Sequence, residues 1–164
     1  MKKKFKIRPC VVGLGYVGLP VFQMLSRNFT TCGYDIDKKR IEDLKNRIDK
    51  NLDLSSKDFN LKFNSFFTSE HRKLSEFNFF IVTVPTPIFI NKKPNLNFIR
   101  MSFETISKYI KKKDIIILES TVFPGVTENF CKKILNNNKK KLVADKDFFV
   151  GYSPERVNPG DEKH

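Results

Sequence analysis

Short apolar runs alternate along this chain with segments in which apolar residues recur every three or four positions. Residues 79–84 form the clearest strand candidate, because apolar and β-branched side chains follow one another without interruption. The segment from Asn97 is the clearest helix candidate, since Ile99, Phe103 and Ile106 fall on one face. Strands that alternate with helices predict a parallel sheet with helices on both faces.

The same pattern predicts about six strands, the third of them inside an otherwise irregular segment, residues 51–67. A proline-rich loop, residues 85–94, is expected after the fourth strand. Strands are expected at residues 10–12, 31–34, 61–66, 79–84, 115–118 and 148–152. Helices are expected at residues 19–29, 70–77, 97–110 and 127–135. Another helix is expected after a cap at Asp37, with Ile41, Leu44 and Ile48 on one face.

The first strand leads into a glycine-rich turn. Gly13, Gly15 and Gly18 have G-x-G-x-x-G spacing, and Asp35 ends the second strand about 20 residues on. Gly13 permits a tight turn, Gly15 lets a pyrophosphate touch the main chain, and Gly18 lets the helix pack closely on the strand. Asp35 would accept hydrogen bonds from a ribose and repel a 2′-phosphate, which favours NAD over NADP. A purely structural glycine turn is the alternative, but the flanking strand and helix favour a doubly wound Rossmann fold.

Three further polar clusters follow predicted strands, and ligands of such sheets bind beyond the carboxyl ends of the strands. In the first, two prolines flank Thr86 and stiffen its loop. The second, residues 119–127, contains Thr127, which could cap the next helix or face the nicotinamide side of a cofactor. The third, residues 153–160, contains Glu155 and Arg156, which could also be an ordinary surface ion pair.

Taken together, these clusters resemble the UDP-glucose/GDP-mannose dehydrogenase family at its N-terminal NAD-binding domain. The resemblance covers nearly the whole chain, so residues 1–164 are expected to form one NAD-binding Rossmann domain. The matching strings are V-V-G-L-G-Y-V-G-L-P, G-Y-D-I-D-K-K-R-I, E-S-T-V-F-P-G, T-V-P-T-P and G-Y-S-P-E-R-V-N-P-G-D. The last two of them look most like the branch of the family that oxidises UDP-N-acetylhexosamines for surface polysaccharides.

The resemblance also implies a role for individual residues. Glu155 would stand near the reacting carbon, where family members use this acid in handling water and protons. Arg156 and Val157 would touch the nucleotide sugar. The remaining residues would bind the cofactor: Tyr16 and Val17 at the pyrophosphate, Asp35 at the adenosine ribose, Arg40 near the adenine edge, and Thr86, Thr121 and Thr127 toward the nicotinamide half.

Members of this family oxidise the C6 alcohol of a UDP-sugar to a carboxylate with two NAD, and a cysteine holds the intermediate covalently. They continue for well over twice the length of this chain. The further part carries a long central helix, a lysine, an asparagine, the nucleophilic cysteine and a second nucleotide-binding domain. This chain alone is therefore expected to bind NAD and not to complete the oxidation. It could be a truncated product, one half of a split enzyme with a separate C-terminal half, or a fragment. A homo-oligomer is expected for the complete enzyme, and an exposed apolar patch for this part.

The net charge of +13 raises the alternative of a basic polyanion-binding domain. However, the lysines are spread along the chain, with short runs only at residues 2–4, 111–113 and 139–141. This distribution favours a solvated surface over a specific nucleic-acid site. No apolar stretch is long enough to span a membrane, and the basic N-terminus lacks a signal-peptide core, so a cytoplasmic protein is expected.

The chain contains three cysteines, and none of them has the spacing of a metal site. Cys10 and Cys32 fall in predicted strands, and Cys131 falls in a predicted helix. Small buried thiols are therefore expected, rather than a disulfide or a nucleophile. His71 and His164 stand alone in the sequence, and no metal is expected.

Overall fold

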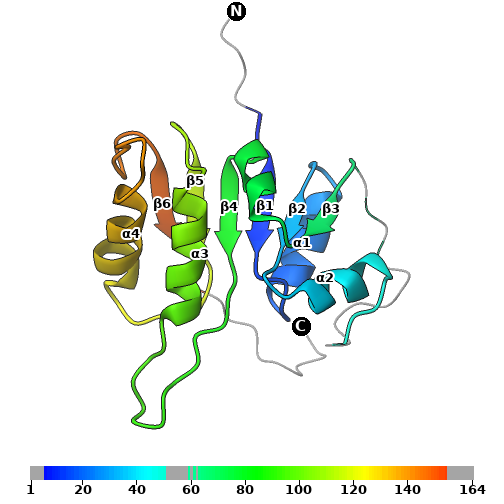
Figure 1. Ribbon diagram of the computed structural model, residues 1–164, viewed down its shortest axis with the longest axis horizontal. Helices are drawn as coiled ribbons and strands as arrows, with labels where there is room; N and C mark the ends of the chain where they lie inside the picture. Colours follow the sequence, from blue (N-terminus) through cyan, green and yellow to red (C-terminus); the bar gives the residue numbers. More distant parts are fainter. Residues whose placement is uncertain (1–5, 51–58, 60, 62, 155–164) are drawn as a thin grey trace, which may run out of the picture.

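The computed structural model describes residues 6–50, 59, 61 and 63–154. Six parallel strands form one sheet in the order β3-β2-β1-β4-β5-β6 (Figure 1). This order confirms the doubly wound Rossmann prediction, and the strand order reverses between β1 and β4. The strands are β1 (Pro9–Val12), β2 (Cys32–Tyr34), β3 (Phe66–Thr68), β4 (Phe79–Val82), β5 (Ile115–Leu118) and β6 (Phe149–Tyr152).

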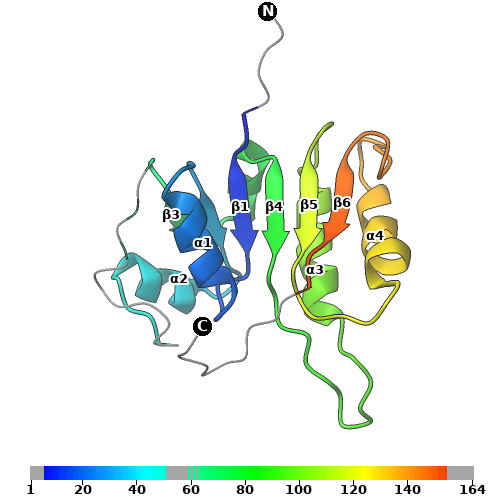
Figure 2. The same ribbon diagram turned by 180° about the vertical axis from the view of Figure 1, so that it is seen from behind.

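Helices lie on both faces of this sheet. The helices α3 (Asn97–Ser107) and α4 (Lys132–Asn136) cover the face seen in Figure 1. The helix α1 (Gly18–Ser26) covers the opposite face, and α2 (Lys38–Lys45) packs beside β3 (Figure 2). Two short segments complete the described elements: a 3₁₀-helix, η1 (His71–Glu76), and a π-helical turn, η2 (Val126–Cys131).

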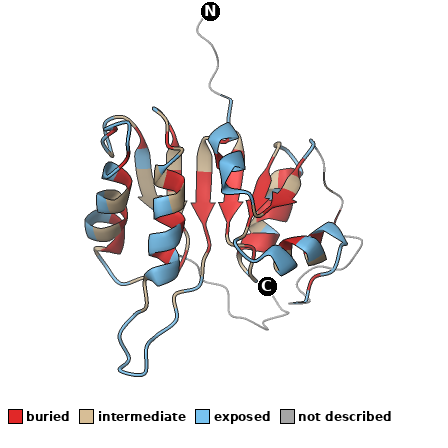
Figure 3. Cartoon of the chain, viewed as in Figure 1, coloured by how far each residue is buried: buried red, intermediate tan, exposed pale blue. Residues whose placement is uncertain are grey.

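The core is divided by the sheet into two layers, and the central strands contribute to both. In β4, Phe80 and Val82 pack with the α3 and α4 side, whereas Ile81 packs with the α1 side. Successive strand residues point to opposite faces, so a run of apolar residues satisfies both layers. Figure 3 shows the resulting concentration of buried residues in β1 and β4. These two strands are therefore a rigid base for whatever binds at their carboxyl ends.

Several predicted boundaries were wrong. The third strand is Phe66–Thr68, not residues 61–66, because pairing of Cys32 with Phe66 sets its register and buries Phe67 against Phe22. The helix α2 ends before Ile48, which is half exposed, because the left-handed Arg47 (φ 61°) turns the chain. The predicted helix over residues 127–135 is two pieces, a π-helical turn and α4. The bounds of β3 were set by its pairing with β2, and local periodicity gives no information about such pairing.

No described helix covers β5 and β6 on the α1 side of the sheet (Figure 2). Ile115 and Ile117 of β5 are only half buried there, and Phe149 of β6 is 50% exposed. An apolar patch of the kind expected from the resemblance therefore lies on this face. None of the helices in the described part of the chain is long and apolar enough to cross a membrane.

Stability is expected to depend on pH through Asp114, a buried aspartate just before β5, at the amino end of the sheet. Burial raises its pKa to about 6, although Lys111 and Lys140 both pull the pKa downward. The native state therefore binds this proton more tightly than the unfolded chain, where the pKa is near 3.8. The resulting stabilisation is complete below about pH 4 and is lost as the pH rises through about 6.

Replacing Asp114 by asparagine keeps an oxygen that can accept the hydrogen bond from the Lys111 main-chain N–H (2.8 Å). We expect Asp114→Asn to be more stable than the wild type above pH 6 by on the order of 2 kcal/mol, and to lose the fall in stability between about pH 4 and 6. Urea unfolding across this range measures both effects. Glu104→Gln removes an exposed carboxylate of α3 and is the control. An unchanged pH profile in Asp114→Asn would contradict the assignment.

Candidate functional site

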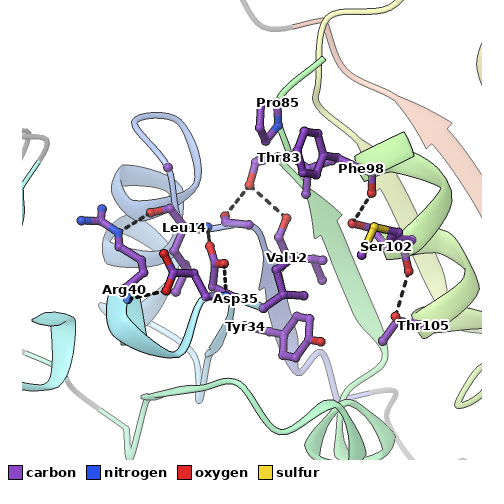
Figure 4. A pocket seen from close by; sticks show the side chains of 16 residues that line it. Val12, Leu14, Tyr34, Asp35, Arg40, Thr83, Pro85, Phe98, Ser102 and Thr105 are labelled. Carbon is purple, nitrogen blue, oxygen red and sulfur yellow. Dashed lines mark hydrogen bonds between the residues drawn. The ribbon is translucent and has the colours of Figure 1, made fainter. Parts of the chain in front are cut away.

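A crevice opens at the carboxyl ends of β1 and β4, where the strand order reverses. It encloses a cavity of about 420 Å³ (Figure 4). A second hollow of about 120 Å³ shares Gly15 and residues 83–85 with it and extends toward β5. The larger cavity is lined by residues 12–15, 34–37, Arg40, 83–85, Phe98, Met101, Ser102 and Thr105. The smaller one is lined by residues 15–17, 83–86 and 119–121.

The glycine loop forms the floor between the two hollows. Gly13 has φ +95°, a left-handed conformation that side chains other than glycine rarely adopt. Its main-chain N–H donates to the Tyr34 carbonyl (2.9 Å), which fixes the turn off β1. A Cβ on Gly15 would meet no protein atom within 4 Å. Open space therefore lies over the main chain at Gly15, as a bound pyrophosphate requires.

Gly18 begins α1 and brings the helix close to the sheet. A Cβ at this position would collide with the Gly13 carbonyl oxygen and with the Thr83 hydroxyl oxygen. The missing side chain is thus what lets α1 start directly above the strand ends. The helix N-terminus then faces the crevice, where its free N–H groups favour an anion.

Asp35 follows β2 and is held by two main-chain N–H groups. Its Oδ2 accepts from Leu14 N (2.8 Å) and its Oδ1 accepts from Asp37 N (2.9 Å). Each carboxylate oxygen keeps a further lone pair, so the group can still accept hydrogen bonds from a ribose. Burial, and then the Asp35 charge, raises the pKa of the neighbouring Tyr34, so its phenol stays protonated.

Arg40 belongs to the crevice lining, but its guanidinium bonds to the protein on the outer side of the glycine loop (Figure 4). Its Nε donates to the Leu14 carbonyl (2.9 Å), and its Nη1 pairs with the buried carboxylate of Asp49 (2.7 Å). Arg40 therefore supports the loop from behind. This contact depends on the packing of α2 and could not be predicted from spacing alone.

The threonines of the predicted site separate into two groups. Thr86 and Thr121 come together in the smaller hollow, where the Thr86 hydroxyl donates to the Thr121 carbonyl (2.8 Å). Tyr16 and Val17 line the same hollow. Thr127 is buried in the first turn of η2 and is absent from both linings, and Gly125, not Thr127, is the N-cap of this turn. Glu155, Arg156 and Val157 lie outside the described residues.

Sequence reasoning missed one wall of the crevice. Phe98, Met101, Ser102 and Thr105 of α3 face the cavity, and Phe98 and Met101 remain partly exposed. Their spacing of three and four is itself a helical stripe, adjacent to the core stripe that starts at Ile99. This second stripe was the available signal.

The three cysteines lie away from the crevice linings, and all are free and buried, as predicted. Cys10 and Cys32 are neighbours on paired strands, and burial raises the pKa of Cys10 well above its ordinary value. Burial, with a contribution from Glu128, raises the pKa of Cys131 to about 12. The thiols of Cys10 and Cys131 are therefore protonated at neutral pH and are poor nucleophiles. Among the described residues, no group of three or more His, Cys, Asp or Glu could hold a metal ion.

A parallel sheet in this order, with a glycine-loop crevice at the switch point, defines a Rossmann domain of the dinucleotide-binding class. Residues 7–164 match the sequence model of the UDP-glucose/GDP-mannose dehydrogenase family, NAD binding domain. The chain belongs to this family and constitutes its NAD-binding domain.

Several of the most similar relatives are named as nucleotide-sugar dehydrogenases. The chain is 43% identical to a UDP-N-acetyl-D-glucosamine 6-dehydrogenase of Salmonella typhi, over 97% of this chain and 37% of the relative. It is 44% identical to the enzyme of the same name from Pseudomonas aeruginosa, over 96% of this chain and 37% of the relative. The solved UDP-D-ManNAc dehydrogenase of Pyrococcus horikoshii superimposes with a TM-score of 0.83 at 31% identity, over 94% of this chain and 37% of that one. The chain thus spans just over a third of the length of these relatives.

Proposed function

We propose that this chain binds NAD as the N-terminal part of a nucleotide-sugar 6-dehydrogenase. The enzyme would oxidise the C6 alcohol of a UDP-sugar, a UDP-N-acetylhexosamine or UDP-glucose, to the uronate with two NAD, for surface polysaccharide synthesis. The observation that carries the proposal is the open main chain at Gly15 beside the carboxylate of Asp35, both lining one cavity. Membership of the family supports the nucleotide-sugar part of the proposal.

The geometry favours NAD over NADP. A 2′-phosphate on the adenosine ribose would approach the Asp35 carboxylate, and like charges repel. Arg40 is the cationic residue of the larger lining, but its Nε and Nη1 already donate to the Leu14 carbonyl and to Asp49. Asp35 would accept hydrogen bonds from the 2′- and 3′-hydroxyls through its remaining lone pairs.

Within the proposed enzyme, bound NAD supplies the hydride acceptor. The residues of this chain orient it: Asp35 at the ribose, the main chain of the glycine loop at the pyrophosphate, and Tyr16 and Val17 beside it. Thr86, Thr121 and Thr127 would contact the nicotinamide half; Thr127, buried in the free chain, would need a shift of η2 to do so. Glu155 would handle water and protons near the reacting carbon, and Arg156 and Val157 would touch the UDP-sugar.

Complete oxidation needs groups beyond this chain. All three cysteines here are buried, and those at positions 10 and 131 have raised pKa values, so none provides the thiolate that the covalent step requires. A longer protein or a separate C-terminal half, in a homo-oligomer, would supply it. The same observation favours the second candidate function, a non-catalytic NAD-binding module.

Titration calorimetry of the full chain with NAD and NADP at physiological salt tests the cofactor assignment. We expect NAD to bind more tightly than NADP, and Asp35→Ala to weaken NAD binding by roughly 10- to 100-fold, because hydrogen bonds to a charged acceptor are lost. Glu76→Ala removes the same charge from η1, beside Arg8 and outside both linings, and is the matched control. Undetectable NAD binding together with salt-sensitive RNA binding would instead support the basic polyanion-binding alternative.

Adding the C-terminal part of a relative separates the two NAD-binding candidates. If this chain belongs to a dehydrogenase, the mixture should reduce NAD when a UDP-sugar is supplied. Omission of the UDP-sugar is the control for background reduction. A chain that binds NAD but yields no activity in any such mixture would be the non-catalytic module.

A further inference from the structure

The buried hydroxyl of Thr83 lies directly beneath the glycine loop. Thr83 follows β4 and is 7% exposed. Its Oγ1 is 2.7 Å from the Gly13 carbonyl oxygen and 3.3 Å from the Val12 carbonyl oxygen (Figure 4). A hydroxyl has one proton to donate, so the shorter contact is the principal hydrogen bond. The Thr83 main-chain N–H already donates to Val12 (2.9 Å), which fixes the residue relative to β1.

This hydrogen bond fixes one end of the peptide unit between Gly13 and Leu14. The carbonyl end accepts from Thr83, just after β4, and the N–H end donates to Asp35, just after β2 (2.8 Å). One peptide plane is thus held from both sides, because β2 and β4 flank β1 in the sheet. Gly13 has the conformational freedom to turn this plane, because glycine tolerates many φ and ψ values. The two side chains remove that freedom.

The orientation of this plane determines where the open main chain at Gly15 faces. The Gly13 carbonyl oxygen and the Thr83 hydroxyl oxygen are also the two atoms that a Cβ on Gly18 would strike. Thr83, Gly13 and the start of α1 therefore meet at one point in the wall of the crevice. A shift of the carbonyl at this point would move both the loop and the helix N-terminus against which a pyrophosphate would lie.

We propose that Thr83 is a positioning residue for the cofactor pyrophosphate, acting through the main chain of the glycine loop. The inference rests on the proposed NAD function and extends it to a residue outside the G-x-G-x-x-G motif. Without the hydroxyl, the Gly13 carbonyl loses its principal donor in a partly buried setting, and the loop is no longer preorganised. The carboxylate of Asp35, proposed to bind the ribose, keeps its hydrogen bonds from Leu14 N and Asp37 N.

The test compares two variants and two ligands on the full chain. Thr83→Ser keeps the hydroxyl, whereas Thr83→Val keeps the shape and removes the hydroxyl. Adenosine lacks the pyrophosphate, and NAD contains it. We expect Thr83→Val to weaken NAD binding by about tenfold or more while changing adenosine binding by less than about twofold. Thr83→Ser should bind both ligands nearly as the wild type does.

Thermal unfolding checks that each variant folds, and Thr83→Ala replaces the valine variant if that one does not. Equal NAD affinity in the wild type and in the variant without the hydroxyl overturns the inference and leaves the proposed function intact. Equal weakening of adenosine and NAD also overturns it, because a merely structural role would affect both. A serine variant as weak as the valine variant has the same consequence. Failure of the wild type to bind NAD at all overturns the proposed function itself.

Discussion

Alanine at position 15 is expected to weaken NAD binding by roughly two orders of magnitude while leaving the protein as stable as before. The new Cβ would meet no protein atom within 4 Å, so it costs nothing in the free protein. Gly15 is not one of the glycines with positive φ, and alanine there can even stabilise by about 0.5 kcal/mol. The methyl group would fill the space that the pyrophosphate needs against the main chain.

Titration calorimetry measures the affinity of the Gly15→Ala variant for NAD. Chemical denaturation measures its free energy of unfolding. Adenosine binding serves as an internal control, because adenosine places no phosphate on the loop. NAD affinity within about threefold of the wild type would show that the ligand does not lie over Gly15. A large loss of stability would show that the position is more crowded than the structure has it.

Alanine at position 18 should have the opposite signature, a large loss of stability. Its Cβ would overlap the Gly13 carbonyl oxygen, a main-chain atom that cannot move without displacing the loop, and also the Thr83 hydroxyl. We expect a loss of about 3 kcal/mol or more in the free energy of unfolding, and a fall of roughly 6–12 °C in Tm. Urea and thermal unfolding test this.

The pair Gly15→Ala and Gly18→Ala makes one change of identical chemistry at two positions of the same motif. A loss below about 1 kcal/mol in the position-18 variant would mean that α1 can slide away from the strand ends at little cost. In that case the close packing of helix on strand would not be what the third glycine provides. Equal behaviour of the two variants would remove the basis for assigning them different roles.

Much of the site could be predicted because its parts are local in sequence. Gly13, Gly15 and Gly18 lie within one turn and one helix start, and Asp35 ends the next strand of a βαβ unit, so their spacing fixes their mutual geometry. The same holds for Thr86 and Thr121, which follow neighbouring parallel strands and meet at one edge of the sheet. The smaller hollow was predictable to that extent.

Other parts could not be predicted because they depend on packing between distant elements. The guanidinium of Arg40 reaches the Leu14 carbonyl and Asp49 only because α2 packs beside the loop. The same reason applies to Thr83, whose hydroxyl donates to the Gly13 carbonyl although the two residues are 70 positions apart in the sequence. The residues of α3 that line the cavity form a stripe with helical spacing in the sequence. That spacing alone does not predict that the stripe faces a cavity.

By itself, the sequence determined the fold class, the glycine turn and the acid that follows the second strand. Apolar periodicity and glycine spacing are local features of the sequence and predict the strands, the helices and the turn. The geometry of a βαβ unit then places the glycines and the acid relative to one another. Only the tertiary structure decided which side chains hold the loop, where the third strand pairs, and that Thr127 is buried outside both linings. Hydrogen bonds and packing between separate strands and helices decide these features, and no local pattern contains that information.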